Sequence, residues 1–422
     1  MTTYRFLAVL VLLLAFLALS ACATPAQAPA ASPTASPVFA IPTLAATIIA
    51  APTRSPASPT PSPTPALAVS TERFALAAGA AHTCLLIDTG LVRCWGANQF
   101  GQLGGGSGHL AALQNAPSTD VANLSDWLVA DLLALPDEAI AIAAGAYHSC
   151  ALTAGGAVLC WGQNVEGQLG DGTTIDSDIP LAVQGLSGDM IAITAGAAHT
   201  CALLAAGIVE CWGANANGQL GDSSSASSSL PVAVQGLSGV QQVVAGVAFT
   251  CALKKDGAIF CWGDGSNGLF SPNASSAPLR LGGLRAGITA IAAGQYHLCA
   301  LIGEQEVDCW GALSSERAYT SSSPQVVNID SPVTQMAAGG GHTCVLTAQG
   351  KVLCWGDNYF GQLGNASDPP TGSPVDVQGL GGQALNIASG SGHVCALIAG
   401  GAVKCWGDGS FGQLGDSTIS WR

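Results

Sequence analysis

Cysteine is the residue type with the most evident chemistry in this chain, which has 422 residues and 15 cysteines. Fourteen of them form seven pairs, and in every pair the second cysteine follows the first by ten residues and precedes Trp-Gly. Such pairs could bind a metal ion as thiolates or could be joined as disulfides. The pairs are Cys84 with Cys94, Cys150 with Cys160, Cys201 with Cys211, Cys251 with Cys261, Cys299 with Cys309, Cys344 with Cys354, and Cys395 with Cys405.

The fifteenth cysteine, Cys22, follows an apolar run at residues 6–21 that stands behind Arg5. This run is too short to span a bilayer comfortably, which takes about twenty residues. It suits the core of a signal peptide, which we predict for residues 1–21. The run ends Leu-Ser-Ala-Cys, which resembles the lipobox of bacterial lipoproteins. That resemblance implies a lipid on Cys22 after cleavage; an ordinary signal peptide with a chance cysteine is the alternative.

Export bears on the chemistry of the paired cysteines, because disulfides form and persist in oxidising compartments outside the cytoplasm. An even number of cysteines at regular spacing is typical of a disulfide framework. The spacing also differs from the short C-x2-C pairs of zinc sites. We therefore predict one disulfide within each pair, with thiolate metal sites as the alternative.

Histidine recurs together with cysteine, two residues before the first cysteine of six pairs, and Phe249 takes the remaining position. A zinc site needs three or four ligands around one ion, whereas these histidines belong to different repeats. We therefore expect structural, hydrogen-bonded histidines and no metal or cofactor. The tryptophans of C-W-G are expected to pack between repeats, and the asparagines of W-G-x-N to bond turn backbone. The histidines and asparagines are His82, His148, His199, His297, His342 and His393, and Asn98, Asn164, Asn215 and Asn358.

Catalytic motifs are not found in the sequence, which has no G-x-S-x-G elbow, H-E-x-x-H pair or Walker loop. A Ser-His-Asp set would need a histidine outside the repeats. The one such histidine is His109, in a Gly-Ser-rich stretch. We therefore predict no catalytic residue.

The cysteine pairs lie in predicted β-hairpins. Two short apolar runs, residues 148–153 and 157–162, flank a three-residue loop that ends in glycine. A loop of this length places Cys150 opposite Cys160. Directly opposed residues that do not share backbone hydrogen bonds have Cα atoms about 4.5 Å apart, within disulfide range. The spacing thus predicts cross-strand disulfides.

Each cysteine pair belongs to a longer unit, since the first cysteines of successive pairs lie 66, 51, 50, 48, 45 and 51 residues apart. An apolar run ending in Ala-Gly precedes the hairpin, and most units continue with G-Q-L-G and Pro-x-x-Val. Each unit can therefore form about four short strands. Four-stranded units repeated around a ring make a β-propeller.

The repeated pattern A-G-x-x-H-[ST]-C-A-L…G-x-V-x-C-W-G-x-N-x-x-G-Q-L-G resembles the regulator of chromosome condensation repeat over residues 77–415. The resemblance implies an all-β, seven-bladed propeller with antiparallel strands. Members of that family known for nucleotide exchange on a small GTPase act inside cells. An exported chain is not expected to meet that partner.

The N-terminal part of the mature chain is a predicted tether. Residues 22–64 are dominated by Ala, Pro, Ser and Thr, so they lack a periodic apolar face and should be disordered. The propeller is predicted for residues 65–422. The last repeat ends before its Pro-x-x-Val strand, and residues 65–69 read Pro-Ala-Leu-Ala-Val. We therefore expect this N-terminal strand to complete the last blade and close the ring; an open solenoid is the alternative.

Composition restricts the partners. Lysine and arginine number 12 against 26 acidic residues, for a net charge of −14. Such a chain offers no basic stripe for nucleic acid, and an acidic surface is repelled by anionic lipid. We expect no nucleic-acid partner, membrane attachment through the lipid alone, and a monomer.

Candidate binding residues lie where the repeat is broken. The first unit carries an insertion within residues 105–137, the fourth replaces G-Q-L-G with Gly-Leu-Phe-Ser, and the fifth loses this turn. Aromatic residues and arginine often anchor protein interfaces, although neutral drift of surface loops is the alternative. The candidates are His109, Trp127, Leu128, Leu132, Phe270, Arg317 and Tyr319.

The predicted function is that of a non-enzymatic binding or scaffold propeller. It would be exported, held by lipid at the cell membrane or outer surface, and would engage an extracytoplasmic protein or other ligand. The alternative is an extracytoplasmic propeller enzyme, a lyase or a carbohydrate-active protein, with its site at one mouth of the ring.

Overall fold

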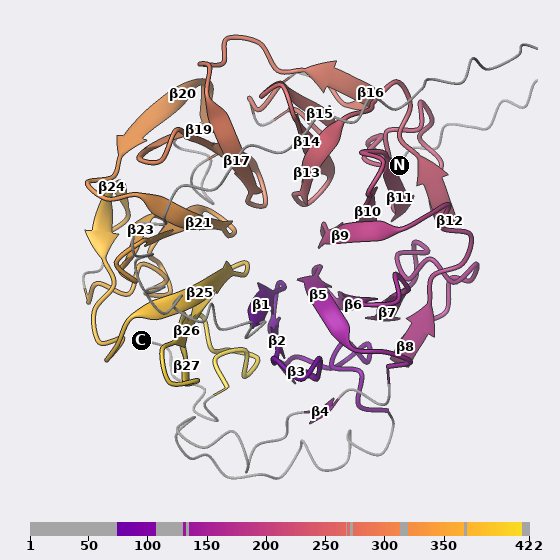
Figure 1. The fold of residues 1–422 in the computed structure, drawn as a ribbon, viewed down its shortest axis with the longest axis horizontal. Helices are drawn as coiled ribbons and strands as arrows, with labels where there is room; N and C mark the ends of the chain where they lie inside the picture. The colour runs from indigo at the N-terminus through magenta and orange to yellow at the C-terminus, as the bar shows by residue number, and fades with distance from the viewer. Residues whose placement is uncertain are drawn as a thin grey trace, which may run out of the picture. The chain divides into compact units, whose positions relative to one another are not determined.

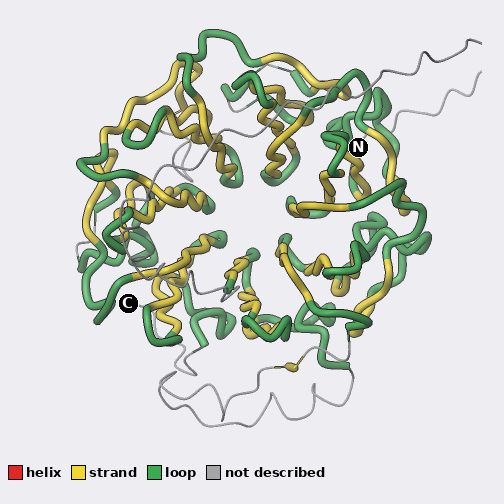
Figure 2. The backbone as a smooth tube through the Cα atoms, in the orientation of Figure 1, coloured by secondary structure: helices red, strands yellow, loops and turns green. Residues whose placement is uncertain are grey.

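The computed structural model describes residues 74–106, 130–131, 135–266, 268–270, 273–312, 320–366 and 369–415. All of them lie within one unit of the chain, residues 68–422. They form seven antiparallel sheets around a central channel (Figure 1), and Figure 2 shows them as strands and loops throughout. No helix that could cross a membrane occurs among these residues. The chain is a seven-bladed β-propeller, as the repeat predicts.

The strands of each blade follow one another from the channel outward. The first three blades hold β1 (Ala75–Ala78), β2 (His82–Leu86), β3 (Val92–Gly96) and β4 (Ala130–Asp131); β5 (Ala139–Ala144), β6 (His148–Thr153), β7 (Val158–Gly162) and β8 (Ser177–Ala182); and β9 (Met190–Ala195), β10 (His199–Leu204), β11 (Val209–Gly213) and β12 (Ser228–Ala233). The next two hold β13 (Val240–Ala245), β14 (Phe249–Lys254), β15 (Ile259–Gly263) and β16 (Ser275–Arg280); and β17 (Ile288–Ala293), β18 (His297–Ile302), β19 (Glu306–Ala312) and β20 (Thr320–Asn328). The last two hold β21 (Val333–Ala338), β22 (His342–Thr347), β23 (Val352–Gly356) and β24 (Thr371–Asp376); and β25 (Ala384–Ser389), β26 (His393–Ile398) and β27 (Val403–Gly407).

The second and third strands of each blade form the predicted hairpin. In the second blade, Cys150 lies opposite Cys160, and Gly156 closes the loop with φ of 82°. Positive φ is the conformation that glycine adopts without a steric penalty. The same register recurs in the other six hairpins, so each first cysteine faces the cysteine ten residues later.

All seven predicted disulfides are present, one in each hairpin. The Cα atoms of the paired cysteines lie 4.0–4.1 Å apart. The predicted cross-strand pairing is therefore confirmed, and the alternative of thiolate metal ligands is wrong. The disulfides join Cys84 to Cys94, Cys150 to Cys160, Cys201 to Cys211, Cys251 to Cys261, Cys299 to Cys309, Cys344 to Cys354, and Cys395 to Cys405.

Each tryptophan of the C-W-G motif packs between two blades. Trp212 is fully buried against Cys150, Leu152 and Leu169 of the preceding blade. Its indole Nε1 donates a hydrogen bond of 3.0 Å to the carbonyl oxygen of Gln168. Burial of one such ring stabilises the fold by a few kcal/mol. The tryptophans therefore join neighbouring blades, as predicted.

The asparagines of W-G-x-N hold the loop that reaches the next blade. The side-chain oxygen of Asn164 accepts a hydrogen bond from the backbone N–H of Leu169 at 2.9 Å. Asn98, Asn215 and Asn358 make the equivalent bond to the leucine of their own G-Q-L-G turn. The prediction that these asparagines bond turn backbone is confirmed.

The last blade packs against the first, so the ring is closed. Trp95 Nε1 and Thr83 Oγ1 both donate to the carbonyl oxygen of Gln413, at 2.9 and 3.0 Å. The backbone N–H of Leu76 donates to Asn386 Oδ1 at 2.9 Å. These contacts rule out an open solenoid. The predicted signal peptide (1–21), the lipidation site Cys22, the tether (22–64) and the closing strand (65–69) lie outside the described residues.

Candidate binding surface

Each blade presents two kinds of connection at the same end, because neighbouring strands are antiparallel. The turn between the first and second strands lies beside the loop that follows Trp-Gly. For example, Gln163 N donates to the carbonyl oxygen of Tyr147 at 2.9 Å, and Ala97 N donates to that of Ala81 at 2.8 Å. We call the end of the ring formed by these turns and loops the mouth face.

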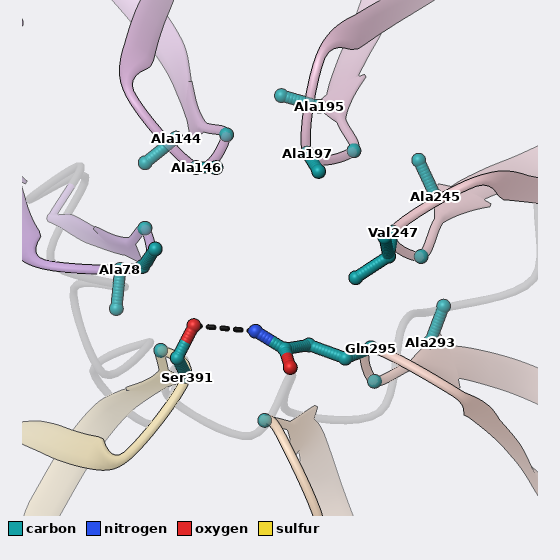
Figure 3. Close-up of a pocket in the computed structure, with 18 of the residues that line it drawn as sticks. Ala78, Ala144, Ala146, Ala195, Ala197, Ala245, Val247, Ala293, Gln295 and Ser391 are labelled. Carbon is teal, nitrogen blue, oxygen red and sulfur yellow. Dashed lines mark hydrogen bonds between the residues drawn. The ribbon is translucent and has the colours of Figure 1, made fainter. Parts of the chain in front are cut away.

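The inner turns of the mouth face surround the opening of the channel (Figure 3). Backbone hydrogen bonds link neighbouring turns, such as Ala197 N to Val247 O at 3.2 Å. The opening is a pocket of about 120 Å³ lined mainly by alanine and glycine. Gln295 Nε2 donates to Ser391 Oγ across it, from the fifth blade to the seventh. The opening is therefore small and nearly uncharged.

The repeated histidines lie beneath this face and join consecutive blades. His148 Nε2 lies 2.9 Å from Thr200 Oγ1, whose hydroxyl donates to the carbonyl oxygen of Gln168 at 3.0 Å. The hydroxyl therefore accepts from the histidine, which carries its proton on Nε2. Burial lowers the histidine pKa to about 3 at His82, His148 and His342, and to about 4 at His199, His297 and His393.

The histidines thus have a structural role, as predicted, and their rings are neutral. Two blade junctions depart from the pattern in which a histidine bonds a hydroxyl of the next blade. At the junction of the fourth and fifth blades, Phe249 replaces histidine, and the hydroxyl position of the next blade is Leu298. At the junction of the sixth and seventh blades, the hydroxyl position is Val394. Neither ring nitrogen of the buried His342 has a hydrogen-bond partner there.

Aromatic residues cluster on one side of the mouth face. They occupy both positions before the Gly-Gln-Leu-Gly turn in the sixth blade, the second of these positions in the seventh and first blades, and one inner turn of the second blade. These blades are neighbours in the ring (Figure 1). We call the set the aromatic arc: Phe100, Tyr147, Tyr359, Phe360 and Phe411.

The arc is accessible to a partner. Tyr359, Phe360 and Phe411 have exposed fractions of 53%, 40% and 57%. Phe100 and Tyr147 are half-buried and face each other with ring centroids 5.3 Å apart. Exposed aromatic rings grouped in this way are typical of protein interaction sites.

The mouth face is also acidic. Its described turns and loops contain seven carboxylates and neither lysine nor arginine. The described lysines and arginines lie instead in strands or in the loops of the opposite face. The carboxylates are Glu166, Asp171, Asp176, Asp222, Asp264, Asp357 and Asp408.

The structure describes one of the seven candidate binding residues predicted from the sequence. Phe270 is half-buried against a core cluster that includes Leu298 and Trp310, so its ring belongs to the junction of the fourth and fifth blades. Its ring is only partly exposed because the neighbouring blade packs against it, and its role as a binding residue stays a prediction. The other candidates lie outside the described residues: His109, Trp127, Leu128, Leu132, Arg317 and Tyr319.

The described ends of the first-blade insertion lie beside the aromatic arc. Gly106 follows the loop of Phe100 and donates its N–H to Asp178 O in the second blade at 2.9 Å. Beyond the undescribed residues, β4 pairs with β3 through Ala130 and Cys94. Gly106, the last described residue before the gap, therefore lies on the mouth face.

The aromatic arc was missed by reasoning from the sequence. The candidates predicted from the sequence lie in an insertion or in units that lack the Gly-Gln-Leu-Gly turn. Most rings of the aromatic arc instead precede a Gly-Gln-Leu-Gly turn that is intact. The available signal was the pair of variable positions before each Gly-Gln-Leu-Gly turn. Compared across repeats, this pair is Tyr359-Phe360 in the sixth blade but Ala216-Asn217 in the third.

In the described part of the chain, a metal site would require three or four ligating side chains around one ion. No group of three or more His, Cys, Asp or Glu side chains placed to hold a metal ion occurs there. The histidines are buried between blades. What the described surface does offer is the exposed arc and its acidic surroundings.

Family models match most of the chain. Residues 125–421 match the RCC1-like domain, and residues 75–102 match the regulator of chromosome condensation (RCC1) repeat. Among curated proteins, the human E3 ubiquitin-protein ligase HERC2 is 36% identical over 161 residues, which are 38% of this chain and 3% of that ligase. The ultraviolet-B receptor UVR8 of Arabidopsis thaliana is 31% identical over 168 residues, 39% of this chain and 35% of the receptor. The chain thus spans only a minor part of these relatives.

Solved structures with the same fold are similarly distant in sequence. Human WBSCR16 gives a TM-score of 0.65 at 22% identity, over 78% of this chain and 87% of that protein. Prp20p of Saccharomyces cerevisiae gives 0.63 at 22% identity, over 75% of this chain and 80% of the yeast protein. At this identity the likeness concerns the fold.

Proposed function

Because this chain belongs to the RCC1-like domain family, whose propeller is a binding and scaffold fold, we propose that it is a non-enzymatic binding protein that holds a partner on its mouth face. The observation that carries the proposal is the exposed aromatic arc. Its rings are not required by the repeat, since other blades form the same loop without them, and they offer anchors of the kind that dominate protein interfaces.

The proposed site of action is outside the cytoplasm. Seven disulfides in one chain are typical of an oxidising compartment. The apolar run at residues 6–21 and the lipobox-like end at Cys22 support export and a lipid anchor. We propose a monomer held at the membrane through this lipid, with residues 22–64 as the tether and no nucleic-acid partner.

The insertion and the irregular fifth loop are proposed to extend the binding surface. The third strand of each of these two blades ends at the mouth face, where the segment that follows it begins. The insertion contributes Trp127, Leu128 and Leu132, and the fifth loop contributes Arg317 and Tyr319. The leucines and aromatic rings among them would add apolar anchors to this surface, and Arg317 would add a cationic one.

Enzymatic activity is not proposed. One relative is named as an E3 ubiquitin-protein ligase, but this chain covers only 3% of it. A propeller lyase or carbohydrate-active enzyme would need carboxylates or a histidine gathered at one mouth of the ring. No observation on the described residues favours such a site.

Site-specific photocrosslinking in the producing cell tests the proposal. A photoreactive residue replaces Gln99 on the mouth face or, as a matched control, Gln349 on the opposite face; both glutamines are exposed. We expect a discrete protein adduct from position 99 and not from position 349. Adducts from position 349 alone, or from neither position, would contradict a partner on the mouth face.

A further inference from the structure

We infer that the partner presents a basic segment, whose arginine or lysine side chains lie against the aromatic arc. This inference rests on the proposed function and adds the chemistry of the partner. It follows from the position of the arc, from its dispensability for folding, and from the charge around it.

The rings of the arc are dispensable for the loops that carry them. In the sixth blade Phe360 N donates to Gln362 Oε1 at 2.9 Å, and in the seventh Phe411 N donates to Gln413 Oε1 at 2.8 Å. In the third blade Asn217 N makes the same bond to Gln219 Oε1 at 3.0 Å. Because the turn forms equally with asparagine, the loop does not require an aromatic ring at this position.

The side chain of Asp408, whose Oδ1 accepts hydrogen bonds from Ser410 N and Ser410 Oγ, lies near one of these rings. Phe360 of the sixth blade and Asp408 of the seventh both approach Gly392, where an added Cβ would lie 3.1 Å from the ring and 3.2 Å from Asp408 Cβ. The face of an aromatic ring is negative and attracts cations. A ring next to a carboxylate therefore favours a guanidinium or ammonium group over a neutral ligand.

The negative charge of the whole mouth face also favours a basic partner. The described turns and loops of the mouth face carry carboxylates and no lysine or arginine. The whole chain has a net charge of −14. Such a surface attracts a basic segment from a distance and repels an acidic one. A neutral sugar could stack on the same rings but would gain nothing from this charge.

Anisotropy titrations with labelled peptides test the inference on the full mature chain. One peptide alternates arginine and glycine, and a second of equal length has glutamine in place of arginine. We expect the arginine peptide to bind at least tenfold more tightly and to weaken as salt increases. Equal binding of the two peptides, or no binding of the arginine peptide, would overturn the inference.

Substitutions in the aromatic arc test whether the arginine peptide binds there. The double variant Y359S/F411S removes two exposed rings and should weaken arginine-peptide binding by about tenfold, given two exposed cation–π contacts. D408N should weaken it severalfold. The control is V165S, since Val165 is 59% exposed at the position of the second blade that matches Tyr359. Its Kd should remain within twofold of the parent protein.

The outcomes separate this inference from the proposed function. If Y359S/F411S binds the arginine peptide as tightly as the parent protein, the arc is not the site and the inference fails. If adducts form at position 99 while the arginine peptide does not bind, the mouth face holds a partner of other chemistry. The proposed function then stands and the inference is wrong. Unchanged disulfides and tryptophan fluorescence establish that each variant is folded.

Discussion

The unpartnered His342 makes a strong prediction about stability. Val394 occupies the position that Thr200 has in the third blade, opposite the tryptophan of the same hairpin. Trp406 Nε1 donates to Gln362 O, as Trp212 Nε1 does to Gln168 O. A threonine at position 394 would therefore find both of the partners that Thr200 has: a histidine Nε2–H to accept from and a carbonyl oxygen to donate to.

The expected magnitude follows from the cost of an unmade hydrogen bond. A buried polar group without a partner costs about 1–3 kcal/mol, and a typical hydrogen bond contributes about 1 kcal/mol. Valine and threonine have nearly the same shape, so V394T should raise the free energy of unfolding by about 1–2 kcal/mol. The reverse change, T200V, leaves His148 Nε2 unpartnered and should lower it by about 1–3 kcal/mol.

Urea unfolding followed by tryptophan fluorescence, with the disulfides intact, measures both changes. The midpoint should rise for V394T and fall for T200V at an unchanged m-value. The double variant should show additive effects, because the two junctions share no partner. If V394T leaves the midpoint unchanged or lowers it, the inference that a hydroxyl at this position stabilises the buried histidine is refuted.

Three further predictions follow from the same junctions and from the disulfides. The buried histidines have pKa values lowered to about 3–4, below the 6.5 of the unfolded chain. The unfolded state therefore binds more protons below pH 6.5, so the free energy of unfolding should fall as the pH is lowered from about 6.5 toward about 4; equal urea midpoints at pH 7.5 and 5 would contradict this. F249H should destabilise the protein by about 2–4 kcal/mol by burying an unpartnered ring, and adding L298T should recover part of that loss in the same assay. Mild reductant with mass mapping should open the bridge between Cys395 and Cys405 first, because Cys405 is half-buried while the other paired cysteines are buried; simultaneous loss of all seven bridges would argue against this order.

Much of the fold follows from local spacing in the chain. A separation of ten residues between paired cysteines, with a three-residue loop that ends in glycine, places Cys150 opposite Cys160. Seven copies of a four-strand unit have few ways to bury their apolar faces other than a ring. The structural role of the histidines also followed from the sequence, because residues that recur in nearly every unit support the unit itself.

The partners of these residues depended on the tertiary structure. His148 bonds Thr200, 52 residues away, and Thr83 bonds His393, 310 residues away. Nothing in the local pattern indicates that Leu298 accompanies Phe249 or that Val394 leaves His342 unpaired, since each pair meets only across a blade junction. Phe270 looked like an exposed anchor because its motif is irregular, but the neighbouring blade packs against it.

The sequence by itself therefore determined the repeat, the hairpin register and the pairing of the cysteines, because each depends on spacing within a unit. Ring closure was expected from the sequence and was established by contacts such as that of Trp95 Nε1 with Gln413 O. The tertiary structure decided which side chains meet and which stay exposed. Phe100 in the first blade is far along the chain from Tyr359, Phe360 and Phe411 in the sixth and seventh. They become one surface only because ring closure brings the sixth and seventh blades beside the first.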